Sequence, residues 1–163
     1  MARKHPFVRF ARNVLVRLVL HDDEAQARAA ERLVIKARRE QTHLFVADVV
    51  WCELVWVLAR RAGLSRADIA AALDQLLRTE LIVVAAPAII ERALDGYRKG
   101  NGDFADYLVR EQARAGDAGD VVTFDRALKG EDGFRAVRRR VILRRRGTLA
   151  RHPEVHRDRR ASS

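Results

Sequence analysis

Short apolar runs alternate with segments of helical length along most of this chain, and this alternation constrains the fold more than any other feature. Runs of strand length occur at 7–10, 43–46, 81–84, 121–124 and 134–137. Segments with apolar residues at helical spacing occupy the intervals, at 13–20, 21–39, 49–61, 65–79, 87–97 and 103–115, with a short helical piece at 126–129. Such alternation favours an α/β fold. It predicts a sandwich with a central, mostly parallel sheet of about four to five short strands flanked by helices.

The size and composition of the chain exclude several protein classes. With 163 residues, the chain is long enough for one domain with a core of its own. No apolar run approaches the ~20 residues that a membrane span needs, and the N-terminus lacks the apolar stretch of a secretory signal. The single cysteine, Cys52, excludes an internal disulfide and a cysteine zinc site. These features predict a cytoplasmic protein without a membrane partner.

The net charge of +10 is concentrated at the two ends of the chain. Residues 1–13 hold four basic residues and no acid, and residues 138–163 hold ten arginines and two acids, so the remainder is close to neutral. We therefore expect one domain over 1–137, with residues 1–6 flexible, and a disordered, basic, Arg-rich extension over 138–163. A basic tail of this kind can bind RNA, DNA or an acidic partner.

Three acids surround the strand-like run 121–124. Asp103 and Asp106 are three positions apart, so a helix places both carboxylates on one face. Asp125 follows the run directly, and ligands of open α/β sheets bind outside the carboxyl ends of the strands. The structural alternative is that Asp103 and Asp125 each cap a helix. On this stretch alone, the two interpretations have equal weight.

A fourth acid, Glu53, lies in the middle of the apolar segment 49–61. A helix that is apolar almost all round is expected to be buried. A carboxylate in such surroundings is costly unless it is paired, protonated or bound to a metal, so we predict a functional role for Glu53, with a buried arginine partner as the alternative. Trp51 and Trp56 of the same segment are interpreted as core or subunit-interface residues rather than as platforms for base stacking.

Clustered carboxylates repel one another unless a cation neutralises them. Oxygen ligands alone suit Mg2+ or Mn2+. Such ions activate water for attack on a phosphodiester and stabilise the leaving oxygen. The five histidines lack the spacing of metal ligands, and the chain contains no Gly-rich phosphate loop, nucleophile elbow or Walker lysine. The acids therefore point to metal-dependent phosphodiester chemistry.

Four short pieces of the chain carry a resemblance to a known family. They are Asn13-Val14-Leu15-Val16-Arg17, Cys52-Glu53-Leu54-Val55-Trp56-Val57-Leu58, Gly102-Asp103-Phe104-Ala105-Asp106 and Thr123-Phe124-Asp125-Arg126. In order and spacing they resemble the PIN-domain family, and within it the VapC-type toxins of type II toxin–antitoxin systems, over residues 7–137. The resemblance implies a three-layer sandwich and an endoribonuclease that hydrolyses RNA phosphodiesters with Mg2+ or Mn2+. It also implies a homodimer, inhibited by a cognate VapB-type antitoxin.

The resemblance assigns roles to single residues. Glu53, Asp106 and Asp125 are similar to the family's catalytic, metal-binding acids, and Asp103 resembles an additional metal-binding acid of this subgroup. Asn13 and Thr123 resemble supporting polar residues of the site.

The chain departs from the family pattern at Ala11, where the first metal-binding aspartate is expected. Alanine offers the ion no ligand, and the loss of one anionic ligand weakens metal binding. The leading hypothesis is thus a VapC-type ribonuclease with impaired activity. The alternative is a catalytically inactive PIN-like module that binds an antitoxin or RNA. A third hypothesis is a structural α/β domain with an RNA-binding tail.

Overall fold

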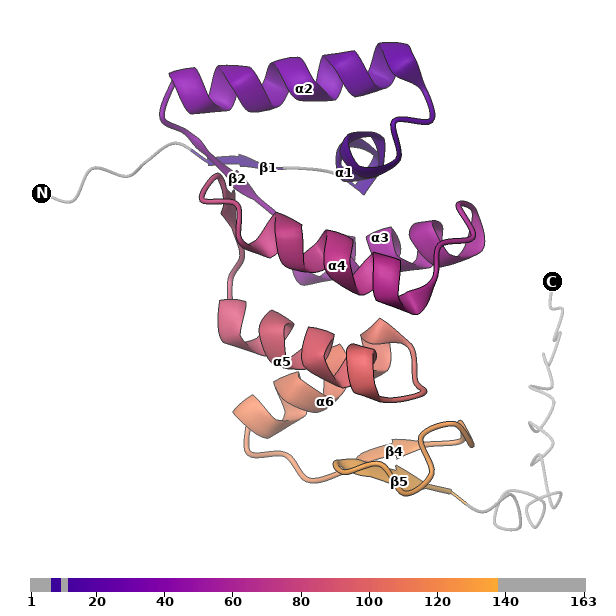
Figure 1. Cartoon of the computed structure of the whole chain (residues 1–163). Helices are drawn as coiled ribbons and strands as arrows, with labels where there is room; N and C mark the ends of the chain where they lie inside the picture. The colour runs from indigo at the N-terminus through magenta and orange to yellow at the C-terminus, as the bar shows by residue number, and fades with distance from the viewer. Residues whose placement is uncertain (1–6, 10–11, 138–163) are drawn as a thin grey trace, which may run out of the picture.

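The structure, a computed structural model, describes residues 7–9 and 12–137 (Figure 1). The elements follow one another as β1 (Phe7–Arg9), α1 (Arg12–Leu20), α2 (Glu24–Arg39), β2 (His43–Phe45), α3 (Asp48–Arg60), α4 (Arg66–Leu77), β3 (Ile82–Val83), α5 (Pro87–Lys99), α6 (Phe104–Ala115), β4 (Val121–Thr123) and β5 (Phe134–Ala136). This order confirms the predicted α/β fold. Residues 1–6, the extension 138–163 and Ala11 lie outside the described residues.

All described strand pairs are parallel, as expected where helices connect successive strands. The five strands form two sheets, one with the order β1-β2-β3 and one in which β4 pairs with β5. Figure 1 shows the helices α3 to α6 between the two sheets. Strands of two or three residues form few ladder hydrogen bonds, so the packing of the helices determines where each pair lies.

The core is built around α3, which buries Trp51, Leu54 and Leu58 completely. The helices α1, α4 and α6 contact α3. The prediction that this helix is buried on all sides is wrong, because Val49 and Trp56 are 64% and 53% exposed. The helices that contact α3 cover its other sides, so one stripe of its apolar surface remains exposed. Trp51 is confirmed as a core residue.

Helix starts show where local chemistry determines the fold. Asp23 caps α2, and its carboxylate accepts a hydrogen bond from the Gln26 amide. Asp48 occupies the first turn of α3, where its Oδ2 accepts a hydrogen bond of 2.8 Å from the Gln112 side chain of α6. The segment 126–129, predicted as a short helical piece, is a turn. Among the described helices, none is both long and apolar enough to cross a membrane.

One buried carboxylate joins α5 to α6. Glu111 is 1% exposed and forms ion pairs with Arg110 at 2.8 Å, Arg92 at 3.0 Å and Arg114 at 3.1 Å. Burial alone would raise the pKa of Glu111, but the bonds from Arg110 and Arg92 lower it below its ordinary value. Glu111 therefore stays charged at neutral pH and ties three arginines together.

We predict that Glu111→Gln lowers the free energy of unfolding by about 2 kcal/mol at neutral pH, because three guanidinium groups lose their counter-charge. A lowered folded-state pKa stabilises the fold above the unfolded value of about 4.3. The difference in the free energy of unfolding between variant and parent should therefore shrink as the pH falls below about 4.3. Urea unfolding at several pH values measures it. Glu91→Gln, at an exposed position on α5, is the control and should stay within about 0.5 kcal/mol.

Candidate functional site

The acids of the candidate site begin at the loop between α5 and α6. Asp103 is the N-cap residue of α6. The structural alternative, in which Asp103 caps a helix, is therefore confirmed for this residue. Asp106 lies one turn into the helix, and its Oδ2 accepts a hydrogen bond of 2.9 Å from the Asp103 amide. This bond fixes the direction of the Asp106 carboxylate relative to the helix start.

A network from distant segments holds this loop in place. The Tyr107 hydroxyl accepts a hydrogen bond of 3.0 Å from the Gly102 amide and donates one of 2.7 Å to Glu131. The second carboxylate oxygen of Glu131 accepts a hydrogen bond of 2.9 Å from the Asn101 amide. A Cβ atom at Gly100 would overlap the Tyr107 hydroxyl. The backbone thus approaches Tyr107 so closely that only glycine is accommodated there.

Arg66, at the start of α4, holds the other side of the loop. Its guanidinium donates hydrogen bonds to the carbonyls of Tyr97 at 2.6 Å and Gly102 at 2.9 Å, and it stacks over the Tyr97 ring at 4.1 Å. Sequence reasoning missed Arg66, Tyr107 and Glu131. Their contacts span up to 36 positions, and no local pattern around an arginine or tyrosine indicates such a partner.

The second acid-bearing segment is the turn after β4. The Asp125 amide donates a hydrogen bond of 3.0 Å to Thr123 Oγ1, and the Asp125 carboxylate accepts one of 2.8 Å from the Ala127 amide. Thr123 therefore supports the backbone that carries Asp125. The Asp125 side chain is exposed at the end of the strand.

The charges of the neighbouring acids act on Asp106. Burial raises the pKa of Asp106, and the neighbouring charges of Asp103, Asp125 and Glu131 raise it further, against the bond from the Asp103 amide, which lowers it. The structure thus brings Asp103, Asp106 and Asp125 into one electrostatic neighbourhood and adds Glu131. Repulsion among these carboxylates makes a cation favourable there.

The sequence predicted that Glu53 is buried, and this prediction is wrong. It is exposed on the open stripe of α3, next to Trp56, because that side of the helix is not covered. Glu53 and Asp103 line the same cavity, so α3 and α6 present one acid each to a shared space. The neighbouring Cys52 is half-buried, and burial raises the pKa of its thiol, which argues against a nucleophilic thiolate.

The donor set fits a hard cation by its chemistry, since all four acids offer carboxylate oxygens. In the part of the chain that the structure describes, no three His, Cys, Asp or Glu side chains lie close enough to hold one ion. Asn13 lies in α1, and the structure does not describe its side chain. Ala11, which stands where the family pattern has its first metal-binding aspartate, is also outside the described residues.

Two comparisons with known proteins identify the family of the chain. The sequence profile of the PIN domain matches residues 12–132, which include every candidate acid. The chain is also similar to a VapC ribonuclease of Aquifex aeolicus (strain VF5), with 30% identity over 118 residues, 72% of this chain and 87% of the relative. The resemblance carried by the four short pieces is thereby confirmed over most of the fold. The chain belongs to the PIN domain family.

Proposed function

We propose that this protein is a ribonuclease of VapC type that hydrolyses RNA phosphodiesters with the help of Mg2+ or Mn2+. The observation that carries the proposal is the position of Asp106, which is partly buried and bonded to the Asp103 amide at 2.9 Å, and whose pKa is raised by that burial and by the charges of Asp103, Asp125 and Glu131. A carboxylate surrounded by other carboxylates gains from a divalent cation, and perturbed acids are typical of reaction sites. The family of the chain, and its similarity to a VapC ribonuclease, support the same chemistry.

We assign the metal-binding role to Asp106 and Asp125, with Glu53 and Asp103 as further ligands. Mg2+ is often held by only one or two carboxylates together with waters and substrate phosphates, so three preassembled protein ligands are not required. When bound, the ion would lower the pKa of a water molecule and stabilise charge on the scissile phosphate.

The residues of the chain supply position and charge. The Asp103 amide holds one oxygen of Asp106, which leaves the other carboxylate oxygen for a ligand. Thr123 and the Ala127 amide hold Asp125 at the end of β4. Glu53 stands on an exposed face of α3 and lines a cavity together with Asp103. No side chain is needed as a nucleophile in this chemistry, because water attacks.

Ala11 reduces the number of anionic ligands by one, so we propose that the activity is impaired. The alternative is a catalytically inactive module that binds an antitoxin or RNA. Ala11 is the feature that separates the two, because an inactive module does not need the missing ligand.

We also propose the partners that the family suggests. A VapB-type antitoxin would cover the acids, and two copies of the chain would associate in the cytoplasm. Surface for such contacts exists, because Val49 on α3 and Val109 on α6 are 64% and 50% exposed.

The first test is cleavage of structured RNAs in the presence of Mn2+. We expect the chain as it stands to cut slowly but above the Asp106→Asn variant, which serves as the blank. Ala11→Asp restores an anionic ligand and should raise the rate on the order of tenfold or more, since charge count tunes metal affinity. Gel analysis of the RNA fragments measures both rates. Cleavage by Ala11→Asp alone would establish the inactive module, and equal cleavage by the parent and the blank would contradict the proposal.

The second test separates metal binding from cleavage. A raised folded-state pKa means that charged Asp106 destabilises the metal-free fold above that pKa, and that the penalty disappears as the pH falls below the unfolded value. Asp106→Asn should therefore have a slightly higher melting temperature than the parent at neutral pH without metal, and an equal one in acid. Added Mn2+ should raise the melting temperature of the parent only.

Asp95→Asn, an exposed position on α5, is the control for this second test. It should respond to Mn2+ like the parent. A Mn2+ response that persists in Asp106→Asn would remove Asp106 from the metal site.

A further inference from the structure

The turn between β4 and β5 carries Asp125 near its start and Glu131 near its end. The Asp125 carboxylate accepts a hydrogen bond of 2.8 Å from the Ala127 amide, and the Glu131 amide donates one of 3.2 Å to the Leu128 carbonyl. Local bonds of this kind limit how far the two acids can move independently of each other. Asp125 and Glu131 are therefore two ends of one compact segment.

Two contacts join this turn to the loop before α6. Leu128 is completely buried, and a Cβ atom at Gly102 would overlap its side chain, so the backbone of the loop packs directly on Leu128. Glu131 Oε1 accepts a hydrogen bond of 2.9 Å from the Asn101 amide, and its Oε2 accepts one of 2.7 Å from the Tyr107 hydroxyl. Both carboxylate oxygens of Glu131 thus hold the segment that leads into α6.

Glu131 brings charge to this junction as well as hydrogen bonds. Its carboxylate acts on Asp106 as a like charge, together with the carboxylates of Asp103 and Asp125. Because both of its oxygens already accept hydrogen bonds, the Glu131 carboxylate is better suited to orient metal ligands than to be one.

We propose that Glu131 is a positioning residue of the candidate metal site, and that its bond with the Tyr107 hydroxyl determines the cation affinity of the acids. The inference rests on the proposed function, since it concerns the same acids. Asp106 belongs to the start of α6 and Asp125 to the turn that Glu131 ends, so a cation between them requires the two segments to be held together. The loss of residues that orient metal ligands typically weakens metal binding about 10- to 100-fold.

Two simpler roles of Glu131 make different predictions. If Glu131 only stabilises the fold, loss of its bonds would lower the melting temperature but leave the Mn2+ affinity of the folded protein unchanged. If Glu131 contributes charge alone, neutralising it would weaken Mn2+ binding, whereas breaking its bond with Tyr107 would not. A positioning role requires that both changes weaken Mn2+ binding.

The test measures the affinity for Mn2+ from the electron paramagnetic resonance signal of the free ion, without RNA. Glu131→Gln removes the charge and one of the two acceptors, and should weaken Mn2+ binding about tenfold. Tyr107→Phe removes the hydroxyl, keeps every charge, and should weaken Mn2+ binding several-fold. In the double variant the loss should be smaller than the product of the two single losses, because both variants break the same bond.

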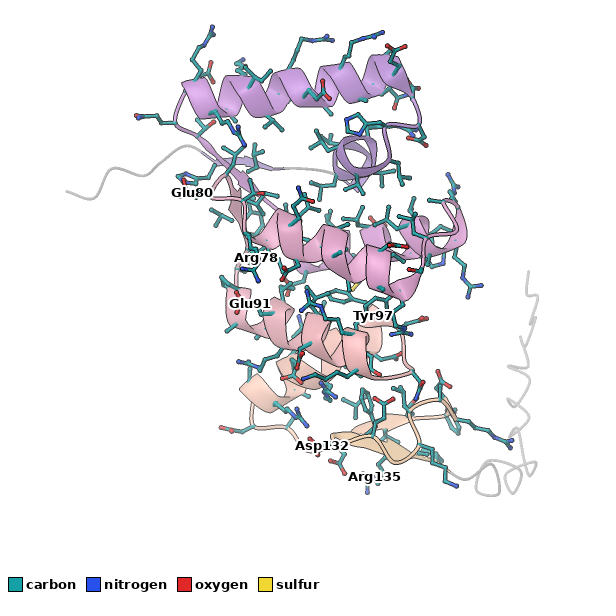
Figure 2. The ribbon with its side chains drawn as sticks, in the orientation of Figure 1. Arg78, Glu80, Glu91, Tyr97, Asp132 and Arg135 are labelled. Atoms are coloured by element: carbon teal, nitrogen blue, oxygen red, sulfur yellow. The ribbon has the colours of Figure 1, made fainter. Side chains whose placement is uncertain are left out.

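Asp132→Asn is the matched control, because it removes the same charge one position after Glu131. The Asp132 side chain is 92% exposed and pairs with Arg114. Figure 2 shows Asp132 beside the strands β4 and β5. This variant should bind Mn2+ like the parent. Circular dichroism at the temperature of the binding measurement verifies that each variant is folded.

Three results would overturn the inference. They are a parent-like Mn2+ affinity of Glu131→Gln, a loss in Glu131→Gln without any loss in Tyr107→Phe, and a parent that binds no Mn2+. Cleavage of RNA is a separate outcome. If the Mn2+ affinity depends on both residues but no RNA is cut, the positioning role stands and the ribonuclease function fails. If RNA is cut and both variants bind Mn2+ like the parent, the reverse holds.

Discussion

The hydrogen bonds of the Tyr107 hydroxyl determine where the acids of this protein lie. One bond goes to the Gly102 amide, directly before Asp103, and the other to Glu131, in the turn before β5. Each such bond contributes only about 1 kcal/mol net, but a buried hydroxyl that loses its partners costs more. The start of α6 and the turn before β5 are therefore coupled through one side chain.

This coupling explains why two interpretations of Asp103 are compatible. As the N-cap residue, Asp103 gains from the positive end of the α6 dipole, and Asp106 accepts the Asp103 amide in return. These interactions stabilise two carboxylates at one helix start, where they would otherwise repel each other. The hydrogen bond from the Asp103 amide opposes, but does not cancel, the burial and the repulsion that raise the pKa of Asp106. The role of Asp103 as a cap therefore does not exclude the metal-binding role that we propose for it.

Local patterns in the sequence predicted the elements well, because helical spacing and short apolar runs depend on nearby residues. The predictions for Asp106 and Asp125 used the same kind of local information, the spacing to Asp103 for one and the place after a strand for the other, and their role in a site stays a prediction. The burial of Glu53 was predicted wrongly, since composition alone does not show which side of an apolar helix stays uncovered. The partners Arg66 and Glu131 could not be predicted, because they meet the loop across 30 positions or more.

The uncovered side of α3 is the reason why Glu53 is exposed rather than buried. A helix with so many apolar residues would bury more surface if another element covered it, and exposed tryptophan is costly in water. The open stripe lies beside Glu53 and the cavity that Tyr97 and Phe104 line. The elements that pack on a helix thus decide which of its sides are buried, and composition decides only how much apolar surface they can cover.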